Sequence, residues 1–326
     1  MTALPPKPIR SRRGVAAALL GLPAALLVLL SLPYLLSTYN LGIVVQMMIF
    51  SLFAMSLDLL VGFSGMPSLG HAAYFGIAAY TAGLLALKMG WSMWSAMPAA
   101  LAASALTAAM FGFLALRTRG SYFLMITLAL SQVAWGIAFG WRSLTGGDDG
   151  MPNIPRPSLS AHWPLSDDRA FYYFVLVFVG LGALLLMRVV ASPFGYALRG
   201  IRESETRMRA LGYDVWRYKF AAFVLAAVVA GLAGCLYVYD NRFVSPDYLQ
   251  VVRSAEVLLM VILGGAGTLI GPAIGASLIV VLENLISAYT ERWLMVLGVI
   301  YILVAMFAPR GILGFIRERL RARAKP

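Results

Sequence analysis

The chain has 326 residues, of which 61% are hydrophobic and 12% are charged, about half the charged fraction of a typical soluble domain. With a mean hydropathy of +0.82, this composition excludes a disordered chain, a collagen, a coiled coil and a disulfide scaffold, and it argues against a soluble enzyme. One cysteine and two histidines are too few for an internal disulfide or a structural zinc site of the usual kind. We therefore expect an all-α polytopic membrane protein.

Apolar segments long enough to cross a bilayer, about 20 residues each, follow one another through most of the chain. The stretch 257–285 is too long for one upright span and contains clustered glycines, so we interpret it as two spans with a break between them. The sequence thus predicts about ten transmembrane helices. They are 15–36, 41–61, 71–87, 93–116, 122–140, 171–186, 220–238, the two parts of 257–285, and 293–307.

Basic residues are distributed unevenly over the segments between these spans. Most of the 26 Lys and Arg residues lie in the N-terminal arm, around 117–119, in the loop 191–217 and in the C-terminal tail. The positive-inside rule therefore places both termini in the cytoplasm. The expected organisation is a basic arm (1–14), a transmembrane domain (15–307) and a basic tail (308–326). Because the charge is dispersed over loops, we expect no nucleic-acid binding despite the pI of about 10.0.

Three aqueous segments between the spans are long enough to matter. The outer loop 141–169 contains four prolines and the sequence TGGDDG, and the segment 240–253 is predicted to be a short polar outer loop. The inner loop 191–217 has helical character and contains no proline after its start. We expect the helix within it to end at Gly212. Its apolar residues Leu198, Ile201, Met208 and Leu211 share one helical face. Such a loop is either a protein-docking surface or an interfacial helix on anionic lipid.

Two apolar segments, 62–76 and 263–276, are interrupted by glycine and proline. Non-helical backbone at membrane depth persists only where protein or a water-filled cavity satisfies its polar groups, and interrupted helices line substrate paths in transporters. The first segment is alternatively a tight turn at the inner surface. The second is alternatively a site of close helix packing through small residues such as Gly271 and Gly275. It lacks the lysine of a phosphate-binding loop.

Motifs distributed over 41–314 resemble, in order and spacing, the permease subunits of branched-chain amino acid ABC importers. The matching positions are Gly65, 68–72, Gly76, Gly120, 122–123, 127–129, 145–147, Gly150, 192–195, 201–203, 211–212, 218–219, 222–223, 230–234, 264–265, 267–268, 271–272, Pro309 and Gly311. The TGG sequence and the basic arm resemble the longer of the two permease types in such importers. The chain departs from the family pattern at Asp58, where asparagine is common, at Gly200, where alanine is usual, and at Met208, where a small residue is preferred.

The resemblance implies a type-II-like ABC importer permease in a bacterial inner membrane, with 141–169 in the periplasm. It implies ATP-driven import of branched-chain amino acids or a related small polar solute. The expected partners are a second homologous permease, two cytoplasmic ATPase subunits, a periplasmic substrate-binding protein and membrane lipid. ATP and magnesium would bind to the ATPases, so no catalytic residue, cofactor or metal is expected on this chain.

The resemblance also assigns candidate residues. Those expected to couple to an ATPase lie in the inner loop: Phe194, Arg199, Arg202, Glu203, Glu205 and Gly212. Candidates for the translocation path lie in the spans and at the two interruptions: Ser64, Ser68, His71, Tyr74, Thr127, Ser131, Gln132, Gly264, Gly265 and Gly267. For the polar members of the second set, local hydrogen bonding to backbone or to neighbouring helices is the alternative role.

Two other classes of function compete with an ABC permease. A secondary transporter driven by an ion gradient needs ionisable groups within its spans, and Asp58 is the candidate, with Glu256 and Glu283 near predicted span ends. An intramembrane enzyme needs a converging nucleophile and base, or metal ligands. Since His162 lies in the outer loop, a site built from both histidines is not expected.

Overall fold

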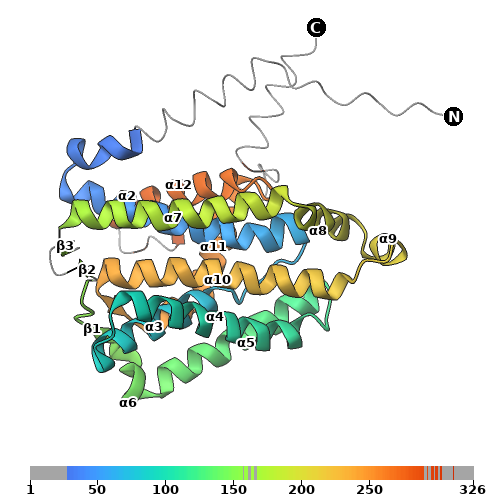
Figure 1. Cartoon of the computed structure of the whole chain (residues 1–326), viewed down its shortest axis with the longest axis horizontal. Coiled ribbons are helices and arrows are strands. Elements are labelled where there is room, and N and C mark those ends of the chain that lie inside the picture. The colour runs from blue at the N-terminus through green and yellow to red at the C-terminus, as the bar shows by residue number, and fades with distance from the viewer. Residues whose placement is uncertain are drawn as a thin grey trace, which may run out of the picture.

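The computed structural model describes residues 28–156, 158–160, 163–164 and 167–289, with a few residues between 292 and 311 (Figure 1). The predicted arm 1–14, most of the predicted spans 15–36 and 293–307, and most of the tail 308–326 lie outside the described residues. Long helices run side by side, and short elements gather at the two ends of the bundle.

Seven helices in the described part are long and apolar enough to cross a membrane. They are α2 (Thr38–Asp58) with its π-helical continuation η1 (Leu59–Ser64), α3 (His71–Met89), α4 (Met93–Ala115), α5 (Ser121–Gly140), α7 (Asp168–Ala191), α10 (Val215–Asn241) and α12 (Ile270–Ser287). The shorter elements are α6 (Arg142–Thr145), η2 (Gly147–Asp149), β1 (Met151–Pro152), β2 (Ser158–Ser160), β3 (Trp163–Pro164), α8 (Pro193–Glu203), α9 (Glu205–Ala210), β4 (Phe243–Val244), η3 (Pro246–Leu249) and α11 (Val251–Gly264).

Helix α11 differs from the predicted full span. Its 14 residues extend about 21 Å, which is short of the roughly 30 Å hydrocarbon layer. The stretch 257–285 therefore contains one half-length helix and one full-length helix, joined at the glycine-rich interruption.

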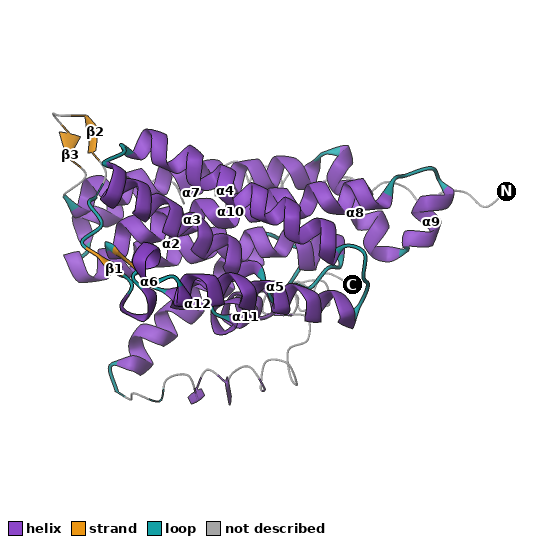
Figure 2. Ribbon diagram, turned by 90° about the horizontal axis from the view of Figure 1, so that it is seen from below, coloured by secondary structure: helices purple, strands orange, loops and turns teal. Residues whose placement is uncertain are grey.

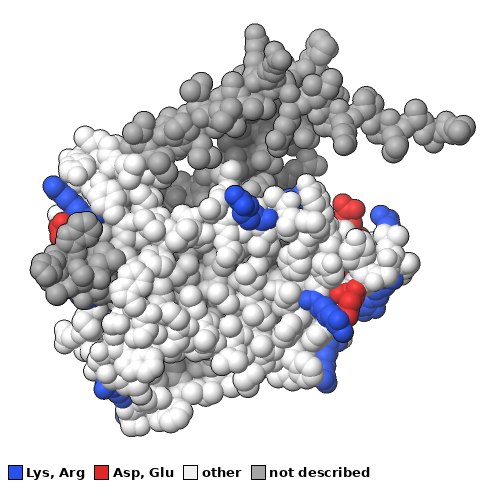
Figure 3. Space-filling model, in the orientation of Figure 1, with Lys and Arg blue, Asp and Glu red and all other residues white. Residues whose placement is uncertain are grey.

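Small residues allow the central helices to approach one another closely. A Cβ atom on Gly231 of α10 would lie 2.9 Å from the Ser104 side chain on α4, and one on Gly234 would overlap the Phe75 carbonyl of α3. The Ser104 hydroxyl donates a hydrogen bond of 2.9 Å to the Ala227 carbonyl. This is the packing expected between helices in lipid, where burial of apolar surface gives little drive for association. Figure 3 shows a broad surface between the two ends of the bundle on which few charged side chains lie.

Residues 65–70 do not form a tight turn at the membrane surface. The His71 ring at the start of α3 hydrogen-bonds the Ser56 hydroxyl at 2.8 Å, whereas the helix that contains Ser56 continues to Ser64, about 10 Å further. The connecting segment therefore runs back into the bundle, where the Leu69 N–H donates to the Thr127 hydroxyl at 3.3 Å. An interruption at membrane depth is thus the better interpretation of this motif.

The predicted outer loop 240–253 also returns into the bundle, and the prediction that it is an aqueous loop is wrong for its second half. Tyr248 and Leu249 of η3 are buried, and the Ala72 N–H at the start of α3 donates to the Ser254 hydroxyl at 3.0 Å. At the outer end, β4 pairs with β1, with Met151 opposite Val244. This pairing closes the outer loop over the point where the chain turns inward.

The inner loop contains two helices instead of the single helix that was predicted. Ser204 takes extended dihedrals (φ −163°, ψ 103°) and caps α9 by accepting a hydrogen bond from the Arg207 N–H at 3.3 Å. Serine competes well for N-cap positions and poorly for helix interiors, which explains the break. Of the predicted apolar face, Leu198, Ile201 and Met208 are buried, but Leu211 is 67% exposed.

The two departures from the family pattern in this loop are complementary. Met208 of α9 folds back on Gly200 of α8, and a Cβ on Gly200 would lie 2.7 Å from the Met208 sulfur. The glycine therefore makes room for a larger side chain. Met208 packs with Ala197, Ile201 and Val215 in a small core of its own, so the two short helices form one packed unit.

Candidate functional site

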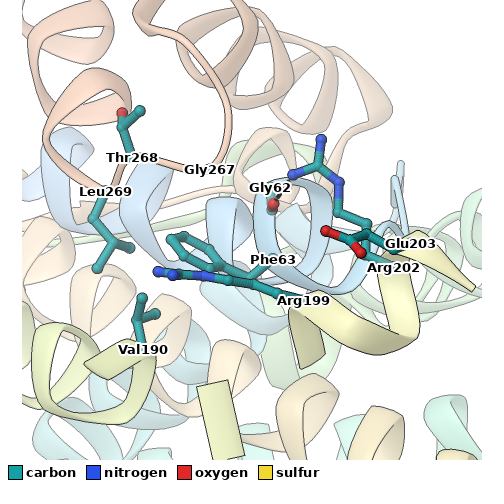
Figure 4. Close-up of a pocket in the computed structure, with 9 residues that line it drawn as sticks. All are labelled: Gly62, Phe63, Val190, Arg199, Arg202, Glu203, Gly267, Thr268 and Leu269. Carbon is teal, nitrogen blue, oxygen red and sulfur yellow. Dashed lines mark hydrogen bonds between the residues drawn. The ribbon is translucent and has the colours of Figure 1, made fainter. Parts of the chain in front are cut away.

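The candidate site lies at the α8 end of the bundle, where the inner loop meets both glycine-rich interruptions (Figure 4). A cavity of about 740 Å³ opens there. Its lining comes from η1, the end of α7, helix α8 and the second interruption: Gly62, Phe63, Val190, Arg199, Arg202, Glu203, Gly267, Thr268 and Leu269. Segments separated by about two hundred residues in sequence thus meet at one place.

Asp58 joins the two interruptions. Its carboxylate is buried at the end of α2 and accepts hydrogen bonds from the Gly267 N–H at 2.6 Å and the Leu269 N–H at 3.0 Å. Buried peptide N–H groups need an acceptor, and the buried Asp58 carboxylate supplies it within the protein. A carboxylate has two acceptor oxygens, so it meets this need for two peptide N–H groups of the interruption.

The interruption that Asp58 holds is strained. Leu269 has φ +58° and ψ −48°, and the Ile270 N–H bonds the Thr268 carbonyl at 2.7 Å, which is the pattern of a γ-turn. A non-glycine residue in such a conformation costs about 1–3 kcal/mol. Gly265 (φ +104°) and Gly267 (φ +84°) supply the remaining left-handed backbone. The hydrogen bonds to Asp58 stabilise this arrangement.

The glycines of the second interruption divide into two groups. A Cβ on Gly275 would lie 2.8 Å from the Gly264 nitrogen, and a Cβ on Gly271 would lie 2.8 Å from the Gly265 carbonyl oxygen. These glycines permit close packing of α11 on α12, which was one of the two predicted roles. Gly267 has another role, because it lies directly against η1. A Cβ on Gly62 would lie 2.6 Å from the Gly267 Cα and would overlap both the Gly267 nitrogen and the Asp58 carboxylate.

Two arginines attach α8 to η1. The Arg202 guanidinium donates a hydrogen bond to the Gly62 carbonyl, and the Arg199 guanidinium lies 5.0 Å from the centre of the Phe63 ring. Figure 4 shows both side chains reaching from α8 toward η1, with Thr268 and Leu269 across the cavity. The predicted coupling loop is therefore in direct contact with the residues that bind the second interruption.

The other predicted coupling residues occupy different environments. Glu205 forms ion pairs with Arg119, Arg209 and Lys219, which tie α9 to the loop after α4 and to α10. Phe194 stacks on Tyr218 with ring centres 5.4 Å apart. Gly212 ends the segment with φ +87°, and Glu203 lines the cavity. The structure also exposes Tyr196 (64%), which the sequence did not single out because only its place on the outer face of α8 distinguishes it.

Most polar candidates for the path are buried and bonded within this chain. The Ser64 hydroxyl donates to Leu59 O at 2.9 Å, Ser68 accepts from the Gly70 N–H, His71 pairs with Ser56, Thr127 bonds Leu124 O and the Leu69 N–H, and the Ser131 hydroxyl donates to Leu249 O at 3.3 Å. Tyr74 is buried beside Phe111 and Phe223, and Gln132 is half-buried on α5. These contacts are the local roles that the sequence left open, and a role in lining the path stays a prediction.

Substitution of Gly62 by alanine tests the contact between the two interruptions. The added methyl group meets backbone atoms of Gly267, which cannot rotate away, so we expect a melting temperature lower by several degrees. Gly42→Ala is the matched control, because the same helix leaves open space there. Thermal unfolding of the detergent-solubilised protein gives the melting temperature of both variants. Equal stability of the two variants would contradict the proposed contact.

Residues 39–305 match the family model described as a branched-chain amino acid transport system permease component. The chain is 31% identical to the high-affinity branched-chain amino acid transport system permease protein LivM of Salmonella typhimurium, over 94% of this chain and 77% of the relative. It is 24% identical to the LivH permease of Escherichia coli, over 81% of this chain and 91% of the relative.

A probable LivM permease of Methanocaldococcus jannaschii is 28% identical over 44% of this chain and 46% of the relative. No solved structure matches the chain. The family match and the coverage of the LivM proteins agree with the fold and with the resemblance seen in the motifs. The chain therefore belongs to the branched-chain amino acid transport permease family, a non-enzymatic membrane subunit of ABC transporters, and is of its longer, LivM type.

Proposed function

We propose that this chain is one of two permease subunits of an ATP-driven importer for branched-chain amino acids or a related small polar solute. The observation that carries the proposal is the chain of contacts from α8 through Arg202 and Gly62 to Asp58 and the strained turn at Leu269. It connects a loop suited to docking with both interrupted segments. A homologous second permease of the LivH type forms the other half of the path, which is supported by the similarity of this chain to LivH.

Two cytoplasmic ATPase subunits bind ATP and magnesium in this proposal, and a periplasmic binding protein delivers the solute. The chain itself needs no cofactor. It lies in a bacterial inner membrane with both termini in the cytoplasm, which is supported by the basic character of its arm, inner loop and tail. Exposed Tyr196 and Leu211 give α8 and α9 an apolar surface, and the similarity to ABC transport permeases supports docking of an ATPase there.

The mechanism follows from the contacts that link α8 to η1 and η1 to the second interruption. Nucleotide binding to the ATPases displaces α8 and α9 as one packed unit, and Arg202 and Arg199 transmit the displacement to η1. Since Asp58 and Gly62 hold the second interruption, the turn that starts α12 moves with η1. This mechanism requires two arrangements of the importer that differ in their contacts, because nucleotide can shift the populations only through such a difference. Glu205 ties the same unit to α10, so several helices move together.

Ion-coupled transport is not favoured, because Asp58 already has a structural role. Both of its oxygens accept peptide N–H groups. In Asp58→Asn one oxygen still accepts a peptide N–H while the other N–H loses its acceptor, so we expect uptake to fall only in part. In Asp58→Ala two N–H groups lose their acceptor, which costs about 1–3 kcal/mol each, and uptake is expected to be lost. Uptake by proteoliposomes measures both. An assembled Asp58→Asn complex without transport would instead indicate that the carboxylate itself carries an ion.

The coupling role is tested by Arg202→Ala in the reconstituted complex of both permeases and both ATPases. Loss of the bond to the Gly62 carbonyl disconnects α8 from η1, so ATP hydrolysis should continue while leucine uptake per ATP falls about tenfold. Arg217→Ala, in the same loop but 81% exposed and paired only locally with Asp214, is the matched control.

An unchanged ratio of uptake to ATP hydrolysis in Arg202→Ala would overturn the coupling role of α8. Absence of ATPases from a gently solubilised native complex would overturn the proposed function itself.

A further inference from the structure

An ion pair lies at the start of α11, outside the site described above. Arg253 and Glu256 are 2.9 Å apart, and Glu283 of α12 lies within electrostatic reach of the guanidinium. The guanidinium lies 5.5 Å from the centre of the Phe50 ring. The side chains of Arg253 and Glu256 remain 18% and 12% exposed, so this chain does not close over them completely.

The ion pair lies near the middle of the membrane. Phe50 is about 18 Å from the start of α2 and about 20 Å from the end of η1. Among the residues that the structure describes, the other ion pairs lie at the α8–α9 end or beside the outer loop. Charged side chains at this depth are costly unless they face a partner or water.

Charged side chains at this depth favour a cover of protein or water over lipid. Val252 is 43% exposed and Ala255 is also exposed on α11, next to Arg253. Helices α5, α11 and α12 lie along one side of the bundle (Figure 2). An opposing protein surface or an aqueous path must cover this side, and charges at its centre favour the path.

Aromatic side chains fix the position of the guanidinium. Phe50, Phe75, Tyr237 and Tyr248 form a cluster in which the Tyr237 and Tyr248 rings lie 5.0 Å apart, and Phe50 and Tyr237 lie 5.3 Å apart. Arg253 lies against this cluster through Phe50. An arginine held in this way loses little freedom on binding, and its planar donors match the two oxygens of a carboxylate.

We propose that Arg253, Glu256 and Glu283 form the point in mid-membrane at which the path holds a zwitterionic amino acid. This inference rests on the proposed function. The solute carboxylate binds the Arg253 guanidinium, and its ammonium group binds Glu256 and Glu283. The resting ion pair between Arg253 and Glu256 is exchanged for pairs with the solute, so the net charge of the cluster is the same before and after binding. A zwitterion preserves the charge balance of the cluster, whereas a simple anion or cation does not.

The experiment uses the reconstituted importer with its binding protein and radiolabelled leucine as the probe. We expect Arg253→Gln to assemble and to hydrolyse ATP at the basal rate, but to import leucine about tenfold or more slowly. Arg253→Lys keeps the positive charge but lacks the planar guanidinium donors, and its rate of leucine import should be intermediate. The charge exchange Arg253→Glu with Glu256→Arg should remain inactive, because it displaces the carboxylate-binding group.

Leucine import at the wild-type rate by Arg253→Gln, or restoration of import by the charge exchange, would overturn this inference and leave the proposed function intact. A wild-type importer that moves no zwitterionic amino acid would overturn the proposed function.

Accessibility gives an independent readout that does not depend on transport. Val252→Cys should react with a membrane-impermeant thiosulfonate and be protected by leucine with its binding protein. Leu181→Cys, 57% exposed on α7, is the matched control and should not react. The native Cys235 is buried and does not interfere. An inert Val252→Cys in both nucleotide-free and vanadate-trapped complexes would show that no path reaches the ion pair.

Discussion

The need to satisfy peptide groups away from water governs this structure. Two segments leave helical geometry within the membrane layer, and every exposed N–H there requires an acceptor from the protein itself. At the second interruption Asp58 provides it for Gly267 and Leu269. The contact holds a strained turn in place and links it to η1.

The contacts around Asp58 also explain why the inner loop matters. The Arg202 guanidinium donates a hydrogen bond to the Gly62 carbonyl, and Gly267 lies against both groups. A displacement of α8 therefore reaches both interruptions without passing through the long helices. The packing of Met208 on Gly200 keeps α8 and α9 together, so the loop moves as a body.

Sequence patterns predicted the membrane class, most span positions, both interruptions and the inner loop, because these depend on local composition and spacing. They did not reveal that Asp58 bonds residues more than two hundred positions away, since a single carboxylate near a span end has several possible roles. The return of η3 into the bundle was missed because its polar neighbours resemble an outer loop. The helix break at Ser204 was missed because the apolar periodicity of 198–208 continues across it, although a serine followed by Glu205 is a recognisable cap.

The central claim is that α8 and the turn at 265–269 move together during nucleotide turnover. Distances between spin labels test it directly, with cysteines at exposed Tyr196 on α8 and Ile270 at the start of α12, and a reference pair from Tyr196 to Trp94 on α4. Between the nucleotide-free and vanadate-trapped importer, the first distance should stay constant while the reference distance changes. A change in the 196–270 distance as large as the change in the reference would contradict the account.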